Sequence, residues 1–147
     1  MITVDKILEK KGSDIWSVQP DSTVLDAIKI MDEKNIGALA VMSEDNIVGI
    51  FSERDYTRRV YALGRDPRDI PIKEVMTTNV LYAKPEQQCE QVLYVMSKHD
   101  IRHMPVIDKE RRVMGMVSIG DMAREIIEVQ KIQIVNLEHY VNWSERY

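Results

Sequence analysis

Two short motifs of the form Ser-x-x-Asp each place a hydroxyl and a carboxylate close together in the sequence. Ser52 precedes Asp55 in the first motif, and Ser118 precedes Asp121 in the second. An ionised carboxylate has two oxygens and can accept hydrogen bonds from a pair of vicinal hydroxyls, such as those of a ribose. A structural role is also open, because Asp is a favoured helix N-cap and a Ser hydroxyl bonds its own backbone in many turns. The two roles can coexist, since a carboxylate has several lone pairs.

Arginines surround the first motif more densely than the second. Arg54, Arg58 and Arg59 lie beside Asp55 in the sequence. The equivalent positions of the second motif hold Gly120, Arg124 and Glu125. Such cations, or a helix N-terminus, bind phosphate groups, although a solvated basic face is the usual alternative for a cluster of this kind. The asymmetry predicts that a site at Asp55 takes the more phosphate-rich ligand.

The two motifs close two copies of one unit. Residues 18–21 recur as residues 83–86, which lie 65 positions later. In both copies apolar residues then occupy positions i, i+3, i+4 and i+7, the pattern of one face of a helix. They are Val24, Ala27, Ile28 and Met31 in the first copy, and Cys89, Val92, Leu93 and Met96 in the second. The alignment therefore assigns Cys89 to the core face of its helix.

Two apolar runs separated by a polar turn follow in each copy and predict a β-hairpin. They span residues 35–51 in the first copy and residues 100–117 in the second, whose turn holds one extra residue. Further helical patterns follow each Asp, over residues 56–63 and 122–130. Each copy thus predicts an extended segment, a helix, two strands and a helix, and the fold class is α/β (α+β). We expect repeats over residues 1–68 and 69–130 and a helical tail over residues 131–147.

The composition is that of an ordinary globular domain. The 147 residues carry a net charge of −4, and no run of Lys and Arg exceeds three residues, so nucleic acid is not an expected partner. Apolar stretches fall far short of the ~20 residues that span a bilayer, and the N-terminus lacks the apolar core of a secretory signal. The single cysteine cannot form an internal disulfide. We expect a cytoplasmic protein without a membrane segment.

In this register the sequence resembles a tandem pair of cystathionine-β-synthase-type (CBS) domains. The resemblance covers about residues 4–129. It rests on the Gly-apolar-apolar-Ser-x-x-Asp motif of both copies, on Val75-Met76-Thr77 and on residues 101–106 and 115–118. It implies a pseudo-two-fold module of two β-α-β-β-α units with two clefts between them. Such clefts bind AMP, ADP, ATP, NAD-type dinucleotides or S-adenosylmethionine, and AMP is the first expectation here. It also implies a homodimer.

The resemblance assigns roles to particular residues. It places Asp55 and Asp121 on ribose, Ser52 and Ser118 on ribose or phosphate oxygens, and Arg102 with His103 on phosphate or against a base. Backbone and apolar contacts to adenine are expected from Thr77 and from segments around residues 15–18 and 80–82. The full set of expected nucleotide-binding residues is Val18, Ile36, Gly37, Ser52, Arg54, Asp55, Arg58, Thr77, Val80, Ile101, Arg102, His103, Ser118 and Asp121.

The expected function is a sensor that transmits its ligand state to a partner protein that the sequence leaves unknown. The alternative is a structural or dimerisation module with empty clefts. We expect no enzyme activity, no catalytic cofactor and no metal site. The sequence has no phosphate-binding GxxxxGK[ST] loop, no nucleophile elbow and no His/Cys cluster at metal-ligand spacing. The tail either folds back over the module or contacts a second chain with Trp143 as an anchor.

Overall fold

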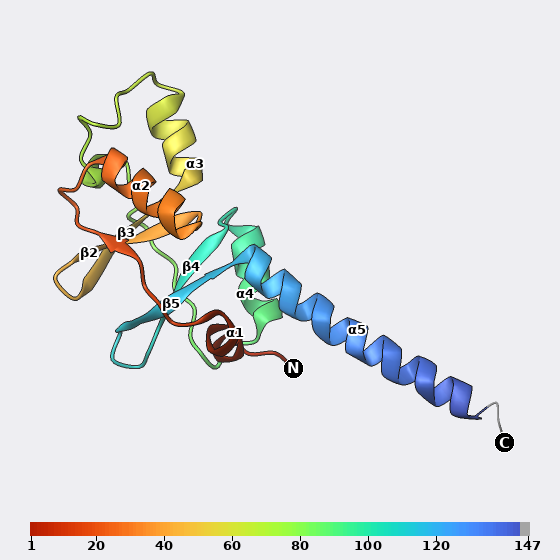
Figure 1. The fold of residues 1–147 in the computed structure, drawn as a ribbon. Coiled ribbons are helices and arrows are strands. Elements are labelled where there is room, and N and C mark those ends of the chain that lie inside the picture. The colour runs from red at the N-terminus through yellow and green to blue at the C-terminus, as the bar shows by residue number, and fades with distance from the viewer. Residues whose placement is uncertain (145–147) are drawn as a thin grey trace.

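The computed structural model describes the backbone of residues 1–144 and the side chains of residues 1–139 and 141. Figure 1 shows two α/β halves side by side and a long C-terminal helix that projects away from them. The α/β fold class and the repeat of the unit are confirmed.

The first half is a three-stranded sheet covered by a helix. Strand β1 (Ser17–Val18) pairs in parallel with β2 (Ala38–Ser43), which forms an antiparallel hairpin with β3 (Asn46–Ser52). Helix α2 (Val24–Lys34) begins at the N-cap Thr23, whose side chain accepts a hydrogen bond from the backbone of the third helical residue. Its buried residues are the apolar positions of the predicted helical face.

The second half repeats the helix and hairpin but not the parallel strand. Helix α4 (Cys89–Lys98) is followed by β4 (His103–Ile107) and β5 (Val113–Ser118), which pair antiparallel. The bulge between Val41 and Met42 recurs between Val106 and Ile107. Cys89 is fully buried on the core face of α4, which confirms its predicted place.

The extended strand expected at residues 80–82 does not form. Only Ala83 pairs with β4, through a single parallel bridge to Val106. In the first half the backbone N–H of Ala40 donates to the carbonyl of Trp16 at 3.3 Å. The equivalent residue of the second half is Pro105, which has no N–H and cannot make this bond. The second sheet therefore has two strands.

The helices that follow the hairpins begin three residues earlier than predicted. Helix α3 (Glu53–Tyr56) continues into the π-helical turn η1 (Thr57–Tyr61), and α5 spans Ile119–Ser144. The residue that caps α3 is Ser52, whose hydroxyl accepts a hydrogen bond from the backbone of Asp55 at 3.2 Å. The N-cap role considered for the aspartates is thus wrong, because Asp55 is the third residue of its helix.

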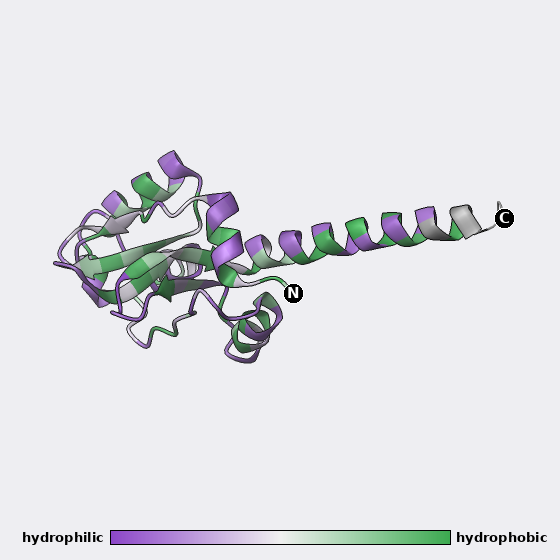
Figure 2. Ribbon diagram, turned by 90° about the horizontal axis from the view of Figure 1, so that it is seen from below, coloured by the Kyte–Doolittle hydropathy of each residue, from purple (hydrophilic) through white to green (hydrophobic). Residues whose placement is uncertain are grey.

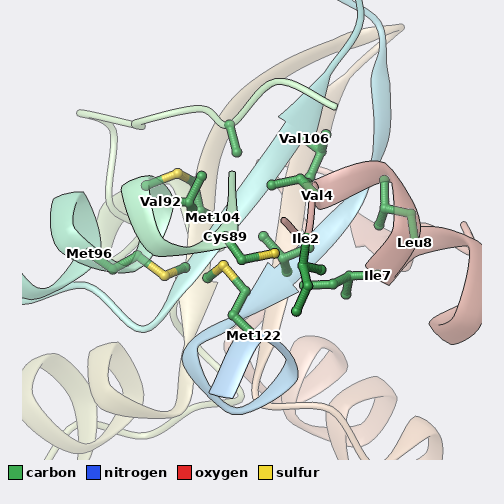
Figure 3. Packing of buried hydrophobic residues seen from close by; sticks show 12 residues of the cluster. Ile2, Val4, Ile7, Leu8, Cys89, Val92, Met96, Met104, Val106 and Met122 are labelled. Carbon is green, nitrogen blue, oxygen red and sulfur yellow. The ribbon is translucent and has the colours of Figure 1, made fainter. Parts of the chain in front are cut away.

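The core of each half includes residues from the segment that comes just before the other half in the sequence. The N-terminal helix α1 (Val4–Lys11), which the sequence analysis missed, packs in the core of the second half (Figure 3). The short 3-10 helix η2 (Ile72–Glu74) packs in the core of the first half. The residues contributed by this exchange are Ile2, Val4, Ile7 and Leu8 to the second core, and Ile70, Ile72 and Val75 to the first.

The exchanged segments explain the glycine that opens each Gly-apolar-apolar-Ser motif. A Cβ atom on Gly49 would lie 2.6 Å from the sulfur of Met76 and 2.9 Å from the backbone oxygen of Thr77. A Cβ atom on Gly115 would lie 2.8 Å from a methyl carbon of Leu8. A side chain at either position would therefore collide with the segment that crosses the strand.

Helix α5 leaves the body after about three turns. Met122 is fully buried in the second core, and Ile126 and Val129 pack against it. The described side chains of residues 130–141 are exposed, and Figures 1 and 2 show this part of the helix standing clear of both halves. The tail therefore does not fold back over the module, and the side chain of Trp143 lies outside the described residues. Within the described chain, no helix has the length and apolarity to cross a membrane.

Candidate functional site

Two cavities lie between the halves, one beside each Ser-x-x-Asp motif. The Asp55 cleft has a volume of about 250 Å³ and the Asp121 cleft about 370 Å³. These volumes lie near the lower end of the range for pockets that bind small organic ligands. From the expected set, the Asp55 cleft is lined by Gly37, Ser52, Arg54, Asp55, Arg58, Thr77, Val80, Ile101, Arg102 and His103. The Asp121 cleft is lined by Ile36, Gly37, His103, Ser118 and Asp121.

Val18 is the one expected residue that lines neither cleft. It is 7% exposed and belongs to the core of the first half. The two residues that precede β1, Ile15 and Trp16, line the Asp121 cleft instead.

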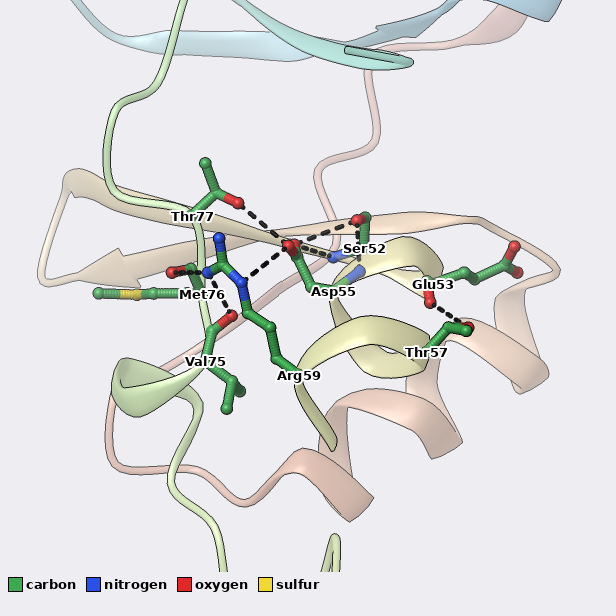
Figure 4. Close-up of polar contacts among 8 residues, drawn as sticks. All are labelled: Ser52, Glu53, Asp55, Thr57, Arg59, Val75, Met76 and Thr77. Carbon is green, nitrogen blue, oxygen red and sulfur yellow. Dashed lines mark hydrogen bonds and ion pairs between the residues drawn. The ribbon is translucent and has the colours of Figure 1, made fainter. Parts of the chain in front are cut away.

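The carboxylate of Asp55 is held in a fixed orientation at the wall of its cleft (Figure 4). Its Oδ2 atom accepts hydrogen bonds from the backbone N–H of Ser52 at 3.0 Å and from the Ser52 hydroxyl at 3.1 Å. Its Oδ1 atom accepts a hydrogen bond from the hydroxyl of Thr77 at 3.1 Å. Asp55 is the single charged residue that is buried in the described chain, at 9% exposure. Two neutral hydroxyls and one amide therefore orient a buried carboxylate.

In this arrangement no cation donates a hydrogen bond to the carboxylate of Asp55, although Arg59 forms an ion pair with it. The nearest cation, the guanidinium of Arg59, has its Nε atom 3.9 Å from Oδ1, too far for a hydrogen bond. Arg59 instead donates to the backbone oxygens of Val75 and Met76 at 3.0 and 2.9 Å (Figure 4). A carboxylate offers about four acceptor positions, and three are used here. A ligand hydroxyl can take the fourth or replace the hydroxyl of Thr77.

The second carboxylate, Asp121, has a different environment although its motif is the same. Its Oδ2 atom accepts hydrogen bonds from the ammonium of Lys11 at 2.6 Å and from the backbone of Ser118 at 2.9 Å. Its Oδ1 atom accepts from the guanidinium of Arg124 at 2.8 Å. Lys11 also donates to the backbone oxygen of Met116 at 2.9 Å. Two cations of the chain itself therefore neutralise this carboxylate.

The charge state of Asp121 reflects these contacts. Burial raises its pKa, but the hydrogen bonds from Lys11 and Ser118 lower it by more, so the net pKa lies below the ordinary value. A hydrogen bond from a cation favours the ionised form. The carboxylate is therefore ionised and already bonded to an ammonium of the chain itself.

Some arginines of the Asp55 cleft already have hydrogen-bond or ion-pair partners in the chain, and others do not. Arg54 reaches across to the second half, where it donates to the backbone oxygen of Asp100 at 2.6 Å and lies 3.3 Å from its carboxylate. Arg58 and Arg102 line the same cleft, and within the described chain neither guanidinium has a hydrogen-bond or ion-pair partner. These two are the cations available to a phosphate group.

His103 lies between the two clefts and lines both. Its ring carbon and Nε2 atom would lie 3.2 Å from a Cβ atom on Gly37, so the absence of a side chain there makes room for the ring. Burial lowers the pKa of His103, and the nearby ammonium of Lys11 lowers it further. The imidazole is therefore mainly neutral at neutral pH and can accept as well as donate a hydrogen bond.

The sequence analysis missed the most consequential residue of the Asp121 cleft. Lys11 lies at the C-terminal end of α1, and the conformation of Gly12, with a φ of 93°, ends the helix there. The spacing of Val4, Ile7 and Leu8 follows the helical pattern and could have revealed α1. The described residues contain no group of three His, Cys, Asp or Glu side chains able to hold a metal ion.

Comparisons with known proteins agree on the family of the chain. The family model described as the CBS domain matches residues 4–62 and 72–128. A CBS domain-containing protein of Arabidopsis thaliana, CBSX3, mitochondrial, is 32% identical over 149 residues, which cover 95% of this chain and 71% of that protein.

Solved structures share the fold over most of the chain. A signal-transduction protein with CBS domains from Burkholderia ambifaria has a TM-score of 0.83 and 39% identity, over 86% of this chain and 95% of that one. The CBS domain pair of protein MJ0100 was solved in complex with 5′-methylthioadenosine and S-adenosyl-L-methionine. It has a TM-score of 0.74 and 29% identity, over 86% of this chain and 96% of its own.

Proposed function

Because the chain belongs to the CBS domain family and carries two copies of the domain, we propose that it is a sensor of an adenosine-containing ligand that binds in the Asp55 cleft. The observation that carries the proposal is the buried carboxylate of Asp55, which is oriented by Ser52 and Thr77 and has no cation within hydrogen-bond distance. Such a carboxylate gains most from a ligand that brings its own hydroxyl donors.

The cations of the cleft favour a ligand with phosphate groups. Arg58 comes from the first half and Arg102 from the second, and both line the cleft without a partner among the described residues. A guanidinium binds phosphate oxygens through a pair of N–H donors. AMP, ADP and ATP combine a ribose diol with a terminal phosphate, which NAD and S-adenosylmethionine lack, so we propose one of them, with AMP first, ahead of NAD-type dinucleotides or S-adenosylmethionine.

Ligand binding at this position would connect the two halves. A nucleotide bonded to Asp55 of the first half and to Arg102 of the second favours the relative arrangement of the halves that satisfies both contacts. A ligand shifts an equilibrium only through such differential affinity. We propose that a partner protein reads the resulting arrangement. The alternative, a structural module with empty clefts, lacks these ligand-dependent contacts.

Thermal unfolding with AMP, ADP, ATP, NAD, NADH, S-adenosylmethionine and adenosine tests the proposal. A ligand present at about 100 times its Kd raises the free energy of unfolding by about 2.7 kcal/mol. We expect AMP, ADP or ATP to raise the melting temperature more than adenosine does at equal concentration. No increase with any of the seven ligands would contradict the sensor function and leave the structural one.

Removing the ammonium of Lys11 should allow a nucleotide to bind in the Asp121 cleft. In the wild-type protein we expect one nucleotide per chain, because Lys11 occupies Asp121. Lys11→Met removes the ammonium and keeps the length of the side chain. We expect a second site to appear in isothermal titration calorimetry, with an affinity gain of about tenfold or more, since a hydrogen bond to a charged group contributes ~1.5–3 kcal/mol.

Lys10→Met is the matched control for this experiment. Lys10 is the preceding residue of α1, and its ammonium bonds Glu125 at 2.6 Å outside the clefts. The Lys10→Met variant should still bind one nucleotide per chain. Two sites in the wild-type protein, or an unchanged single site in Lys11→Met, would show that Lys11 does not block the Asp121 cleft.

We propose binding rather than catalysis, and action in a reducing compartment such as the cytoplasm. The carboxylates of the two clefts are not a matched acid and base, because each is bonded within its own half or to α1. Burial raises the pKa of the Cys89 thiol to about 11, so this side chain is an unreactive part of the core.

A further inference from the structure

The outer part of α5 is a helix without a protein surface beneath it. The CBS domain match ends at residue 128, whereas α5 continues to Ser144. Figure 2 shows green and purple bands alternating along this projecting helix, which is therefore not uniformly polar. Three of its apolar side chains, Ile127, Ile134 and Leu137, are 50%, 55% and 65% exposed. A helix of this length without tertiary contacts is marginally stable in water, so a partner on its apolar side chains would stabilise it.

These apolar residues follow the spacing of a coiled coil. Ile127, Ile134 and Val141 are seven residues apart, and Leu137 comes three residues after Ile134. They occupy heptad positions a, a, a and d of one stripe along the helix, whose preceding d position holds Gln130, while the exposed Ile132 and Val135 lie off it. β-Branched residues at a with Leu at d are typical of two-stranded coiled coils. The stripe therefore fits a second helix of the same kind.

The charges beside the stripe indicate how the second helix runs. Lys131 and Glu138 both occupy position e, on the same side of the stripe. In an antiparallel pair the e positions of the two helices face each other, so Lys131 would lie beside Glu138 of the partner subunit, twice by symmetry. In a parallel pair position e faces position g, where the uncharged Gln133 lies. The charges thus complement each other only in the antiparallel arrangement.

We propose that α5 pairs antiparallel with α5 of a second copy of this chain, so that Ile134 of each chain packs against Leu137 of the other. The pairing is isologous, because the same stripe serves both chains and the two-fold axis lies between residues 135 and 136. It leaves the two bodies at opposite ends of the helix pair. The pairing does not depend on nucleotide binding in the clefts.

The oligomeric state of full-length variants tests the pairing. Sedimentation velocity should find a dimer for the wild-type protein and a monomer for the double variant Ile134→Glu/Leu137→Glu. We expect the dimer Kd to rise by a factor of about 100 or more, because four charges enter the apolar seam of each dimer. Circular dichroism at the same concentration reports whether the body remains folded.

Val135→Glu is the matched control. Val135 is adjacent to Ile134 and 61% exposed, but it occupies position b on the outer face of the helix. The control should remain a dimer. A wild-type monomer, a dimer that survives the double variant, or equal dissociation of Val135→Glu would overturn the proposal.

A distance measurement tests the antiparallel orientation. A spin label on Glu128→Cys reacts selectively, because the native Cys89 is buried. In the antiparallel pair the two labelled positions are separated by about 22 Å along the helix axis. In a parallel pair the two labelled positions lie at the same height, with no separation along the helix axis. A single short distance would overturn the antiparallel pairing.

Discussion

Replacing Asp55 by Asn should abolish nucleotide-dependent stabilisation of the protein, whereas Asp121→Asn should leave it nearly intact. The two aspartates occupy equivalent positions, but only Asp55 keeps a carboxylate to which no cation donates a hydrogen bond. Loss of its charge weakens two hydrogen bonds to a ribose diol, each worth ~1.5–3 kcal/mol when charged. The nucleotide Kd should therefore rise on the order of 100-fold or more, as measured by isothermal titration calorimetry.

The pair of variants separates a ligand role from the structural contact that each aspartate makes as the third residue of its helix. Both aspartates bond the backbone N–H of their own Ser, at 3.0 Å for Asp55 and 2.9 Å for Asp121. Asn keeps an acceptor oxygen but not the charge, so this contact weakens, and the free energy of unfolding of the unliganded protein should fall by about 1 kcal/mol in either variant. Equal loss of nucleotide affinity in both variants would contradict the assignment of the ligand to the Asp55 cleft. Unchanged affinity in Asp55→Asn would show that Asp55 does not contact the ribose.

Gly49→Ala should destabilise the protein by about 1–3 kcal/mol, the usual cost of overpacking a core. The new methyl group would meet the backbone oxygen of Thr77 at 2.9 Å and the sulfur of Met76 at 2.6 Å. That backbone is fixed, because Ile50 and Thr77 exchange two hydrogen bonds, at 2.9 and 2.8 Å. Urea denaturation monitored by circular dichroism measures the loss.

Gly115→Ala is the natural comparison, because it makes the same change in the other half. Its new methyl group would meet only side-chain atoms of Leu8, at 2.8 Å and beyond, and the end of a side chain can move. We expect it to cost less than Gly49→Ala. Gly49→Ala should also weaken nucleotide binding, because it displaces Thr77 from Asp55. Equal destabilisation by both variants, with unchanged nucleotide affinity, would refute this account.

Local patterns in the sequence were sufficient for the repeated elements. The spacing of Val24, Ala27 and Met31 placed α2, and its alignment with the second copy placed Cys89 in the core. Both hairpins and the extra residue of the second turn followed from apolar runs. These features depend on neighbours only a few residues away, which explains why they could be predicted.

Other features depend on partners that no local pattern identifies. The missing parallel strand in the second half depends on whether residue 105, on the neighbouring strand, can donate a hydrogen bond. The exchange of α1 and η2 between the cores pairs segments far apart in the chain. The start of α3 at Glu53 required knowing that the hydroxyl of Ser52, and not the carboxylate of Asp55, caps it.

By itself, the sequence determined that this protein carries two copies of one α/β unit, each closed by Ser-x-x-Asp, and that two clefts are to be expected. Only the tertiary structure decided that the two carboxylates differ. Thr77, which bonds Asp55, lies 22 residues away and is neutral, whereas Lys11, which bonds Asp121, lies 110 residues away and is charged. The physical reason is the exchange of segments, which brings Thr77, three residues after η2, to one motif and α1 to the other.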